Sequence, residues 1–539
     1  MTDPEPQDQR RSFASRTPAN DNPDKVAYRR GFVTRHQVTG WRFVMRRIAS
    51  GIALHDTRML VDPLRTQSRA VLMGVLLLVT GLAGCFVFSF IRPSGSAGNN
   101  AVLADRSTAA LYVRVGDELH PVLNLTSARL IVGQPANPTT VKSSELDRFP
   151  RGNLIGIPGA PERMVQNTSR DANWTACDGV SGTGRAAHST GVTVIAGPLD
   201  NSGARAAALD NGHAILVDFP NEQSAGTWLL WDGKRSQIDL ADHAVTSAIG
   251  LGSDASTAPA PRPIAAGLFN AIPEAPPLTA PVIPNAGAPA GFSVPAPIGA
   301  VVVSYGLDEA RAPRDTTSPD TVRYYAVLPD GLQPIAPVLA AILRNTNSYG
   351  LQQPPRLGPD EVAKLPVSRL LDTSRYPGQQ LGLVDAARDP VTCAFWSKPA
   401  GAATSTLSLL SGSALPVSDG VRTLELVGSA NGATRVALAP GTGYFAQSVG
   451  GGASAPSAGS LFWISDTGVR YGIDTEADGH GKTIEALGLK EPVVPVPWSM
   501  LTLFATGPAL SRADALLAHD GLPPDTRPAR PISAEGGAR

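Results

Sequence analysis

The stretch from Ala70 to Ile91 reads AVLMGVLLLVTGLAGCFVFSFI, which is 22 residues without a single charge. About 20 apolar residues in a helix cross a hydrocarbon core of roughly 30 Å. Arg65 and Arg69 precede the stretch, and Arg92 and Pro93 follow it. A soluble core helix rarely runs this far without a polar face. The sequence therefore predicts one transmembrane helix at 70–91, with the rest of the chain divided into a part before it and a part after it.

Basic residues gather on the N-terminal side of this helix. Residues 26–69 contain nine arginines against only Asp56 and Asp62. Because basic flanks stay on the cytoplasmic side, we expect a single-pass protein of the inner membrane. Its N-terminus would be cytoplasmic and its C-terminal domain periplasmic. The whole chain has 46 basic and 46 acidic residues, and this balance indicates no nucleic-acid partner.

Two processed forms of the apolar stretch are possible by pattern. A cleavable signal has a short basic region before its apolar core, whereas 69 residues precede this one. Leu82-Ala83-Gly84-Cys85 matches a lipoprotein box by its letters, but Phe86-Val87-Phe88 continues the apolar run beyond the cysteine. We therefore expect an uncleaved helix without a lipid anchor.

The part before the helix divides into a tail and a basic arm. Residues 1–25 are rich in polar residues and proline and predict a disordered cytosolic tail. Within the arm, 26–69, the stretch Val26 to Met59 has apolar residues at three- and four-residue spacing, which predicts an amphipathic helix. A short extended link from Met59 to Pro63 follows, because a residue before proline avoids the helical conformation. Such a helix can lie on the anionic inner leaflet, dock a cytosolic partner, or present solvated charge over a small local core. The candidate contact residues are Arg29, Arg30, Phe32, Arg35, Trp41, Arg42, Arg46 and Arg47.

The part after the helix contains a pattern that occurs four times: an apolar strand, a tight turn, a second strand and usually a helix. The turns Asp232-Gly233 and Asp330-Gly331 predict hairpins, because glycine takes the positive φ that such turns require. The strand–turn–strand segments are 111–122, 228–238, 324–335 and 462–473, and the helices are expected at Ser127–Val132, His243–Leu251, Ala336–Arg344 and Thr483–Leu489.

Cys177 and Cys393 are the two cysteines of this exported part, and each follows a repeat in a strand-like segment. An oxidising compartment favours a disulfide between them, and two free thiols are the alternative. We expect an α+β periplasmic domain at 92–539 with a mainly β central core, four small αβ repeat modules in a pseudo-two-fold arrangement, and a disulfide that joins the halves. The expected parts are repeat 1 at about 108–150, a core half at 151–222, repeat 2 at about 223–252, a Pro/Ala-rich connection at 253–298, repeat 3 at about 299–372, a core half at 373–457, repeat 4 at about 458–490 and a Pro-rich return at 491–539.

One segment comes close to a nucleotide-binding motif. Gly481-Lys482-Thr483 ends like a phosphate loop, but the motif requires a small residue five positions before Gly481, where Glu476 stands. The eight histidines show no paired metal-ligand spacing, and no Gly-x-Ser-x-Gly elbow occurs. We therefore expect no catalytic residue, no metal and no cofactor.

Several stretches together resemble one family. They are Arg29–Trp41 (RRGFVTRHQVTGW), Asp62–Arg69 (DPLRTQSR) and Leu123–Leu130 (LNLTSARL), combined with one transmembrane helix and four repeats around a two-cysteine core. This combination resembles the EccB family, membrane components of mycobacterial type VII (ESX) secretion systems. The run from Arg29 to Arg69 is most similar to the EccB of the third ESX system.

The resemblance implies a structural and assembly subunit of an inner-membrane secretion complex. It implies that the cytosolic arm braces partners, which are the EccC-type ATPase, EccD and EccE, and that periplasmic domains of several EccB copies associate. Cys177 and Cys393 match the family's disulfide. Members often carry an ATPase label, but Glu476 breaks the loop and a periplasmic location removes the substrate, so we expect no enzyme. A membrane-tethered periplasmic enzyme, such as an ATPase or hydrolase, or a cell-wall-binding protein remains the alternative.

Overall fold

A computed structural model describes residues 33–55, 63–91, 95–182, 186–219, 226–252, 260–305, 322–426, 432–454, 459–475 and 481–519. The chain forms two compact units, Met1–Ser94 and Gly95–Arg539. Among the described residues, the first unit holds two helices and the second holds the sheets. The boundary between the units lies directly after the predicted transmembrane helix.

Helix α1 (Arg35–Leu54) carries the basic amphipathic pattern of the N-terminal unit. Thr34 caps it: its Oγ1 accepts from the Gln37 backbone N–H, and the Thr34 N–H donates to Gln37 Oε1 at 2.9 Å. This capping box satisfies two backbone groups that an uncapped helix leaves unpaired. The helix ends at His55 in the left-handed conformation. Residues 26–32 and 56–62 of the predicted arm lie outside the described residues.

Helix α2 (Pro63–Ile91) contains the whole apolar stretch and begins seven residues before Ala70. The prediction of an extended link is wrong at Pro63, because proline is the first residue of the helix. Its fixed φ suits that position, and its missing N–H is not needed there. Within the part of the chain that the structure describes, α2 is the one helix of sufficient length and apolar character to cross a membrane, over Ser68–Phe88.

Four sheets of the C-terminal unit follow one chain path: a three-stranded antiparallel meander, a helix, and a strand parallel to the first one. In the first sheet β4 lies parallel to β1, and in the third β16 lies parallel to β13. The first consists of β1 (Val102–Asp105), β2 (Leu111–Val115), β3 (Glu118–Pro121), α3 (Leu125–Val132) and β4 (Thr139–Val141). The third consists of β13 (Val301–Tyr305), β14 (Val322–Leu328), β15 (Gly331–Ile335), α7 (Pro337–Thr346) and β16 (Arg356–Leu357).

The second and fourth sheets extend this path by one more helix and one more strand, which pairs with the last strand of the meander. The second consists of β8 (His213–Phe219), β9 (Gly226–Trp231), β10 (Lys234–Ile238), α5 (His243–Ile249), β11 (Arg262–Pro263), α6 (Ala266–Ala271) and β12 (Glu274–Ala275). The fourth consists of β22 (Tyr444–Val449), β23 (Leu461–Ile464), β24 (Val469–Ile473), α9 (Lys482–Leu487), β25 (Val494–Pro497), α10 (Trp498–Leu501) and β26 (Ala505–Thr506).

The two glycine turns differ from each other. Asp232 (φ 45°) and Gly233 (φ 70°) both take the left-handed conformation, as a type I′ hairpin turn requires. Leu328 pairs with Gly331, so the prediction that Gly331 is a central turn residue is wrong: it is the first residue of β15. A Cβ at this glycine would lie 2.3 Å from the carbonyl oxygen of Pro366. Close backbone approach, rather than turn geometry, requires glycine there.

The fifth sheet lies in the centre and takes strands from both Cys-bearing segments, in the order β20-β21-β6-β5-β18-β19-β7. β5 and β18 lie antiparallel in its middle, and each segment also sends a short strand to the other: β7 pairs with β19, and β21 with β6. The bounds are β5 (Ala172–Ser181), β6 (His188–Ala196), β7 (Ala207–Ala208), β18 (Val391–Lys398), β19 (Thr406–Gly412), β20 (Leu424–Glu425) and β21 (Arg435–Ala437).

Strand pairing sets the extent of each hairpin sheet. It groups β1, β8 and β22 with the hairpins that follow them, ahead of the expected starts of these repeats at about 108, 223 and 458. The reason is that a two-stranded hairpin needs a third strand to bury an apolar face. A further strand, β17 (Gly382–Leu383), pairs parallel with β8 and makes the second sheet six-stranded. The remaining short elements are α4 (Ser143–Leu146), α8 (Pro359–Val362), the 3-10 helix η4 (Thr373–Arg375) and α11 (Arg512–Ala515).

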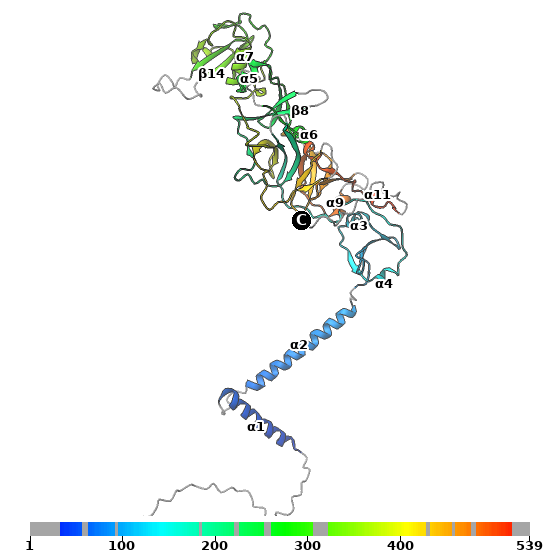
Figure 1. Cartoon of the computed structure of the whole chain (residues 1–539). Coiled ribbons are helices and arrows are strands. Elements are labelled where there is room, and N and C mark those ends of the chain that lie inside the picture. The colour runs from blue at the N-terminus through cyan, green and yellow to red at the C-terminus, as the bar shows by residue number, and fades with distance from the viewer. Residues whose placement is uncertain are drawn as a thin grey trace, which may run out of the picture. The chain divides into compact units, whose positions relative to one another are not determined.

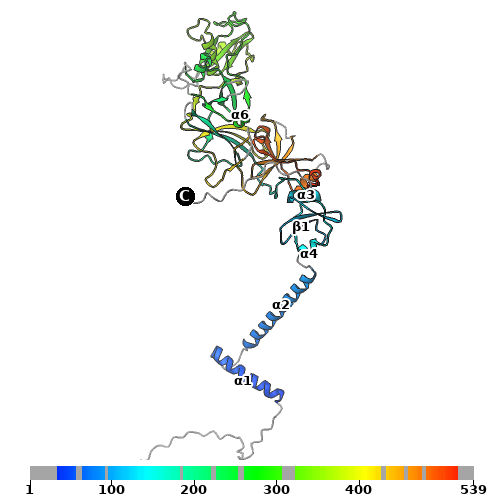
Figure 2. The ribbon, with the colours of Figure 1, turned by 45° about the vertical axis from the view of Figure 1, so that its right-hand side comes forward.

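Neighbours in space are not neighbours in sequence. Helix α3 of the first sheet packs on α9 of the fourth, whereas α5 of the second packs on α7 of the third. Figure 1 shows both helix pairs, and Figure 2 shows α3 and α6 from a second direction. The largest apolar core joins the central sheet to the second and fourth sheets. The central sheet therefore connects two pairs of hairpin sheets.

Candidate functional site

The disulfide lies where the two Cys-bearing segments meet. Cys177 in β5 and Cys393 in β18 face each other directly in the strand register, with their Cα atoms 4.0 Å apart, and form a disulfide. Both residues are fully buried in an apolar cluster with Ile195, Leu410 and Ala437. The bond joins positions 216 residues apart. It therefore ties the two halves of the central sheet together at their midline.

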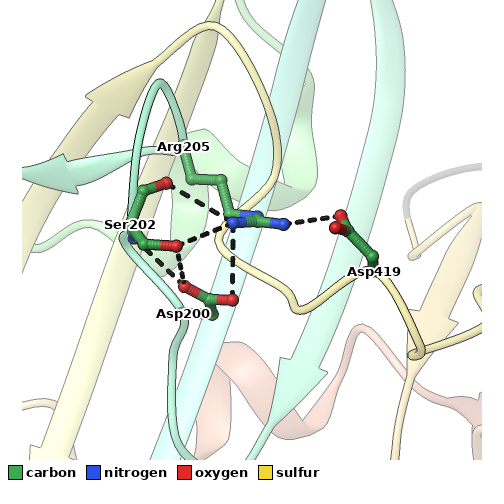
Figure 3. A network of polar contacts seen from close by, with 4 residues as sticks. All are labelled: Asp200, Ser202, Arg205 and Asp419. Atoms are coloured by element: carbon green, nitrogen blue, oxygen red, sulfur yellow. Dashed lines mark hydrogen bonds and ion pairs between the residues drawn. The ribbon is translucent and has the colours of Figure 1, made fainter.

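A polar network joins two loops, one after β6 and one after β19, as Figure 3 shows. The Arg205 guanidinium lies 2.6 Å from Asp419 Oδ1 and 3.4 Å from Asp200 Oδ2, and Arg205 Nη1 also donates to Ser202 Oγ at 2.9 Å. The hydrogen bonds from Ser202, assisted by the charge of Arg205, lower the pKa of Asp200. Asp419 is 98% exposed, so this ion pair contributes little to stability. No sequence motif pointed to these residues.

A buried arginine on strand β11 of the second sheet is hydrogen-bonded to the segment before β18 and to the start of that strand. Arg262 in β11 is only 4% exposed, and it donates to the carbonyl oxygens of Val384 and Asp389 at 3.0 and 2.9 Å. It also donates to Thr392 Oγ1 at 3.1 Å. Burial lowers the pKa of Arg262 to about 10, partly offset by the charges of nearby Asp389 and Asp385. The group therefore remains charged at neutral pH and binds the two halves through hydrogen bonds.

Asp178, next to the disulfide in β5, is also buried. It accepts hydrogen bonds of 2.7 Å from Ser189 Oγ and from the backbone N–H of Ala265. Burial raises the pKa of the Asp178 carboxyl above the ordinary value of 3.8, although these hydrogen bonds act in the opposite direction. The folded protein therefore holds the proton on Asp178 more tightly than the unfolded chain does.

This raised pKa gives a prediction for stability. The contribution of protonated Asp178 is complete below pH 3.8 and is lost as the pH rises through the folded-state pKa. Asp178→Asn removes the titration and retains an acceptor oxygen, so we expect the variant to gain stability relative to the parent chain as the pH rises. Urea unfolding across about pH 3 to 8 checks this. Asp419→Asn is the matched exposed control, and parallel pH profiles for Asp178→Asn and the parent chain would contradict the expectation.

The predicted contact residues of the arm fall into two groups. Arg29, Arg30 and Phe32 lie outside the described residues. The structure places the others, Arg35, Trp41, Arg42, Arg46 and Arg47, on α1. Trp41, Val44, Met45, Ile48 and Ile52 form one apolar face of this helix, and each of these side chains is exposed. α1 thus presents an uncovered apolar face on a helix that has no acidic residue between Arg35 and Leu54.

The near-match to a phosphate loop lies at the start of α9. Gly481 caps the helix at φ 99°, Lys482 is its first residue, and Glu476 lies outside the described residues. Thr483 is only 4% exposed, so its hydroxyl cannot reach a metal-bound phosphate as the motif requires. Within the described residues, no group of three or more His, Cys, Asp or Glu side chains could hold a metal ion.

Comparison with known proteins assigns the family. Residues 30–524 match the family model "Type VII secretion system ESX-1, transport TM domain B". The chain is 76% identical to the "ESX-3 secretion system ATPase EccB3" of Mycobacterium tuberculosis H37Rv, over 98% of both chains. It is 66% identical to the protein of the same name in Mycolicibacterium smegmatis, over 98% of this chain and 99% of the relative.

Solved structures agree with the sequence comparison. The EccB3 dimer from the ESX-3 core complex is 60% identical and has a TM-score of 0.68, over 78% of this chain and all of that chain. An intact ESX-5 inner membrane complex contains a chain that is 36% identical, with a TM-score of 0.69, over 94% of this chain and 99% of that one. The chain therefore belongs to the EccB family of type VII secretion systems, and its sequence resembles the ESX-3 members much more than the ESX-5 members.

Proposed function

We propose that this chain is a structural and assembly subunit of an inner-membrane type VII secretion complex of the ESX-3 kind. The observation that carries the proposal is its 76% identity, over nearly the full length, to an ESX-3 EccB3. A similar solved structure is that of an EccB3 dimer from the ESX-3 core complex. The presence of structured parts on both sides of one apolar helix fits a subunit that connects two compartments.

The arrangement in the membrane is part of the proposal. Helix α2 crosses the inner membrane, the basic helix α1 lies in the cytoplasm, and the C-terminal unit lies in the periplasm. The excess of arginine before α2 supports this orientation. The Cys177–Cys393 disulfide supports it as well, because such bonds persist in oxidising compartments.

The periplasmic unit is proposed to be pseudo-two-fold, with four repeat modules. Four sheets share one chain path, and the second and fourth both extend it by one helix and one strand, although β17 joins only the second. The exchange of β7 and β21 relates the two halves of the central sheet. Each half also places its first module against the second module of the other half, through α3 with α9 and α7 with α5. This interlocking suits a rigid support for other subunits.

For partners we propose the EccC-type ATPase, EccD and EccE at the cytosolic side and other EccB copies in the periplasm. The apolar face of α1 supports a cytosolic partner, because five of its large side chains are exposed. The inner leaflet is the competing occupant, since basic amphipathic helices also bind anionic lipid.

Recovery of the complex from membranes tests the proposed function. A tag on the full-length chain in native membranes should recover a large complex that contains an ATPase, and its absence would refute the proposal.

The α1 face gives a second prediction. Ile48→Asp places a charge in the middle of the apolar face, and burial of an unpaired charge in an interface is costly. We expect the amount of complex recovered with the tagged chain to fall by about tenfold, which corresponds to about 1.4 kcal/mol. Native gel electrophoresis of the solubilised membranes measures it. Phe43→Asp is the matched control on another face of the helix, and an equal loss in both variants would contradict a specific role for the Ile48 face.

The names of the relatives include the word ATPase. We propose that this chain hydrolyses no ATP at Gly481–Thr483, because Thr483 is buried and the segment belongs to the periplasmic unit. Lys482→Ala should therefore leave the rate of phosphate release from ATP by the purified full-length chain unchanged. The lysine of a true phosphate loop contacts the β- and γ-phosphates, so its removal would abolish activity. A strong loss of activity in this variant would overturn the assignment and favour the membrane-tethered enzyme.

A further inference from the structure

The second and fourth sheets place an arginine at the same strand position. Arg235 is the second residue of β10, and Arg470 is the second residue of β24. Each of these strands has a short parallel neighbour after a helix, which is β12 or β26. The register pairs Arg235 with Glu274 but Arg470 with Thr506. One arginine therefore has an acidic neighbour, and the other has a neutral one.

In the second sheet both terminal nitrogens of the arginine have partners within the chain. Arg235 Nη2 lies 3.1 Å from Glu274 Oε2, and Nη1 donates to the carbonyl oxygens of Phe269 and, at 2.7 Å, of Ile272. The guanidinium also lies over the Phe269 ring, 4.0 Å from its centroid. Phe269 and the neighbouring Trp228 are buried. Both the charge and the aromatic rings of this position are thus covered from within.

In the fourth sheet the arginine at the same strand position has a neutral neighbour and lies beside a half-exposed tryptophan. Arg470 Nη2 donates to Thr506 Oγ1 at 3.0 Å, and no described carboxylate forms an ion pair with it. Its guanidinium lies 5.5 Å from the centroid of Trp498 and 6.0 Å from that of Phe462. Trp498 is 52% exposed, although it is a large aromatic residue in an ordered helix. Arg470, Trp498 and Phe462 therefore form a surface, here called the Arg470 platform, with a half-exposed tryptophan ring and a guanidinium that has no carboxylate partner among the described residues.

We propose that the Arg470 platform docks an acidic segment of a partner protein. The partner's carboxylate takes the role that Glu274 has beside Arg235, and an adjoining apolar side chain covers Trp498. Arginine binds carboxylates in a bidentate geometry, and tryptophan and arginine are the residue types that most often dominate protein interfaces. The inference rests on the proposed function, because it assigns a partner surface to the periplasmic unit of a complex subunit.

Charge decides between a different protein and a second copy of this chain. A two-fold axis through the platform would bring the two Arg470 guanidinium groups of the copies against each other. Like charges at short distance oppose such a contact. A partner that supplies the carboxylate removes this cost and pairs the half-buried arginine, so the platform fits a different, acidic chain.

Site-specific photocrosslinking in native membranes tests the proposal. Thr502 lies four residues after Trp498 and is exposed, so it accepts a benzoylphenylalanine in the full-length chain. We expect adducts with peptides of another protein that contain Asp or Glu. Their yield should fall by about tenfold in both Arg470→Gln and Trp498→Ala, as for a central interface residue. Val282→Ala is the matched control, because Val282 is 92% exposed elsewhere on the unit, and its yield should not change.

Three results would contradict the docking proposal. They are adducts that persist in both variants, adducts that contain only lipid, glycan or a second copy of this chain, and the absence of any adduct. Thermal unfolding of each variant shows whether the fold is retained, and the exposed Trp498→Ala keeps the test decisive if Arg470→Gln unfolds. Recovery of the complex through a tag on the same chain separates the two proposals. A complex that is recovered without the adduct refutes the platform alone, whereas loss of the complex from the unsubstituted chain refutes the proposed function.

Discussion

Replacement of both Cys177 and Cys393 by alanine is expected to lower the free energy of unfolding of the C-terminal unit by about 5 kcal/mol. The disulfide closes a loop between positions 216 residues apart, so the reduced unfolded chain gains a large conformational entropy. The two sulfurs are also fully buried between β5 and β18, and the shorter side chains leave a cavity there. Urea unfolding of the full-length chain in detergent, followed by tryptophan fluorescence, measures the loss.

Cys85→Ala is the control for this experiment. Cys85 is a free, exposed cysteine on α2, outside the C-terminal unit, so its replacement should leave the urea midpoint unchanged. Peptide mapping without reductant should recover the 177–393 pair from the parent chain. Equal midpoints for the double variant and Cys85→Ala would show that the bond does not constrain the halves.

The second large effect is expected for Trp174→Ala, at about 3–5 kcal/mol. Trp174 in β5 is among the largest fully buried side chains, and its ring meets Tyr444 and Phe504 edge-on at centroid distances of 5.2 and 6.1 Å. Its Nε1 donates to the Pro495 carbonyl oxygen at 2.8 Å. These three partners come from the fourth sheet and its return, so truncation opens a cavity at the junction between the halves.

Two substitutions calibrate this prediction. Trp174→Phe retains most of the apolar contact and loses the hydrogen bond to Pro495, so we expect a loss of about 1–3 kcal/mol. Trp498→Ala removes an exposed tryptophan and should change stability much less. Urea unfolding of the three variants under one condition gives the ranking. A loss for Trp174→Ala no larger than that for Trp498→Ala would contradict the burial on which the prediction rests.

Local patterns in the sequence were sufficient to locate most of the helices and hairpins. Periodicity and turn residues located the helix that contains Ala70–Ile91, the four hairpins and the four helices that follow them, with ends that differ by a few residues. Helix α3, for example, begins at Leu125 rather than Ser127, because Asn124 Oδ1 accepts from the Ser127 N–H at 2.8 Å and caps the helix. A cap depends on one side chain and its φ, which an apolar pattern does not report.

The site residues also differ in how far the sequence could predict them. Cys177 and Cys393 stand out in the sequence because cysteine is rare in it, but Arg262 and Asp178 belong to no motif. The platform arginine Arg470 lies within the repeat segment 462–473, where nothing in the pattern distinguishes it. Their properties depend on burial and on neighbours far away in the chain: Arg262 meets Val384, more than a hundred residues later. Glu274 and Thr506, which distinguish Arg235 from Arg470, are set beside them by strand pairing alone.

The sequence by itself determined the apolar helix, the basic arm before it, the hairpins and the cysteine pair, because each rests on composition or on spacing within a few turns of chain. Only the tertiary structure decided that α3 packs on α9, that α5 packs on α7, and that the two Cys-bearing segments exchange strands around the disulfide. The helices of these four sheets all bury apolar faces, so their sequence patterns do not distinguish one packing partner from another. Packing and strand register, which act between distant segments, make that choice.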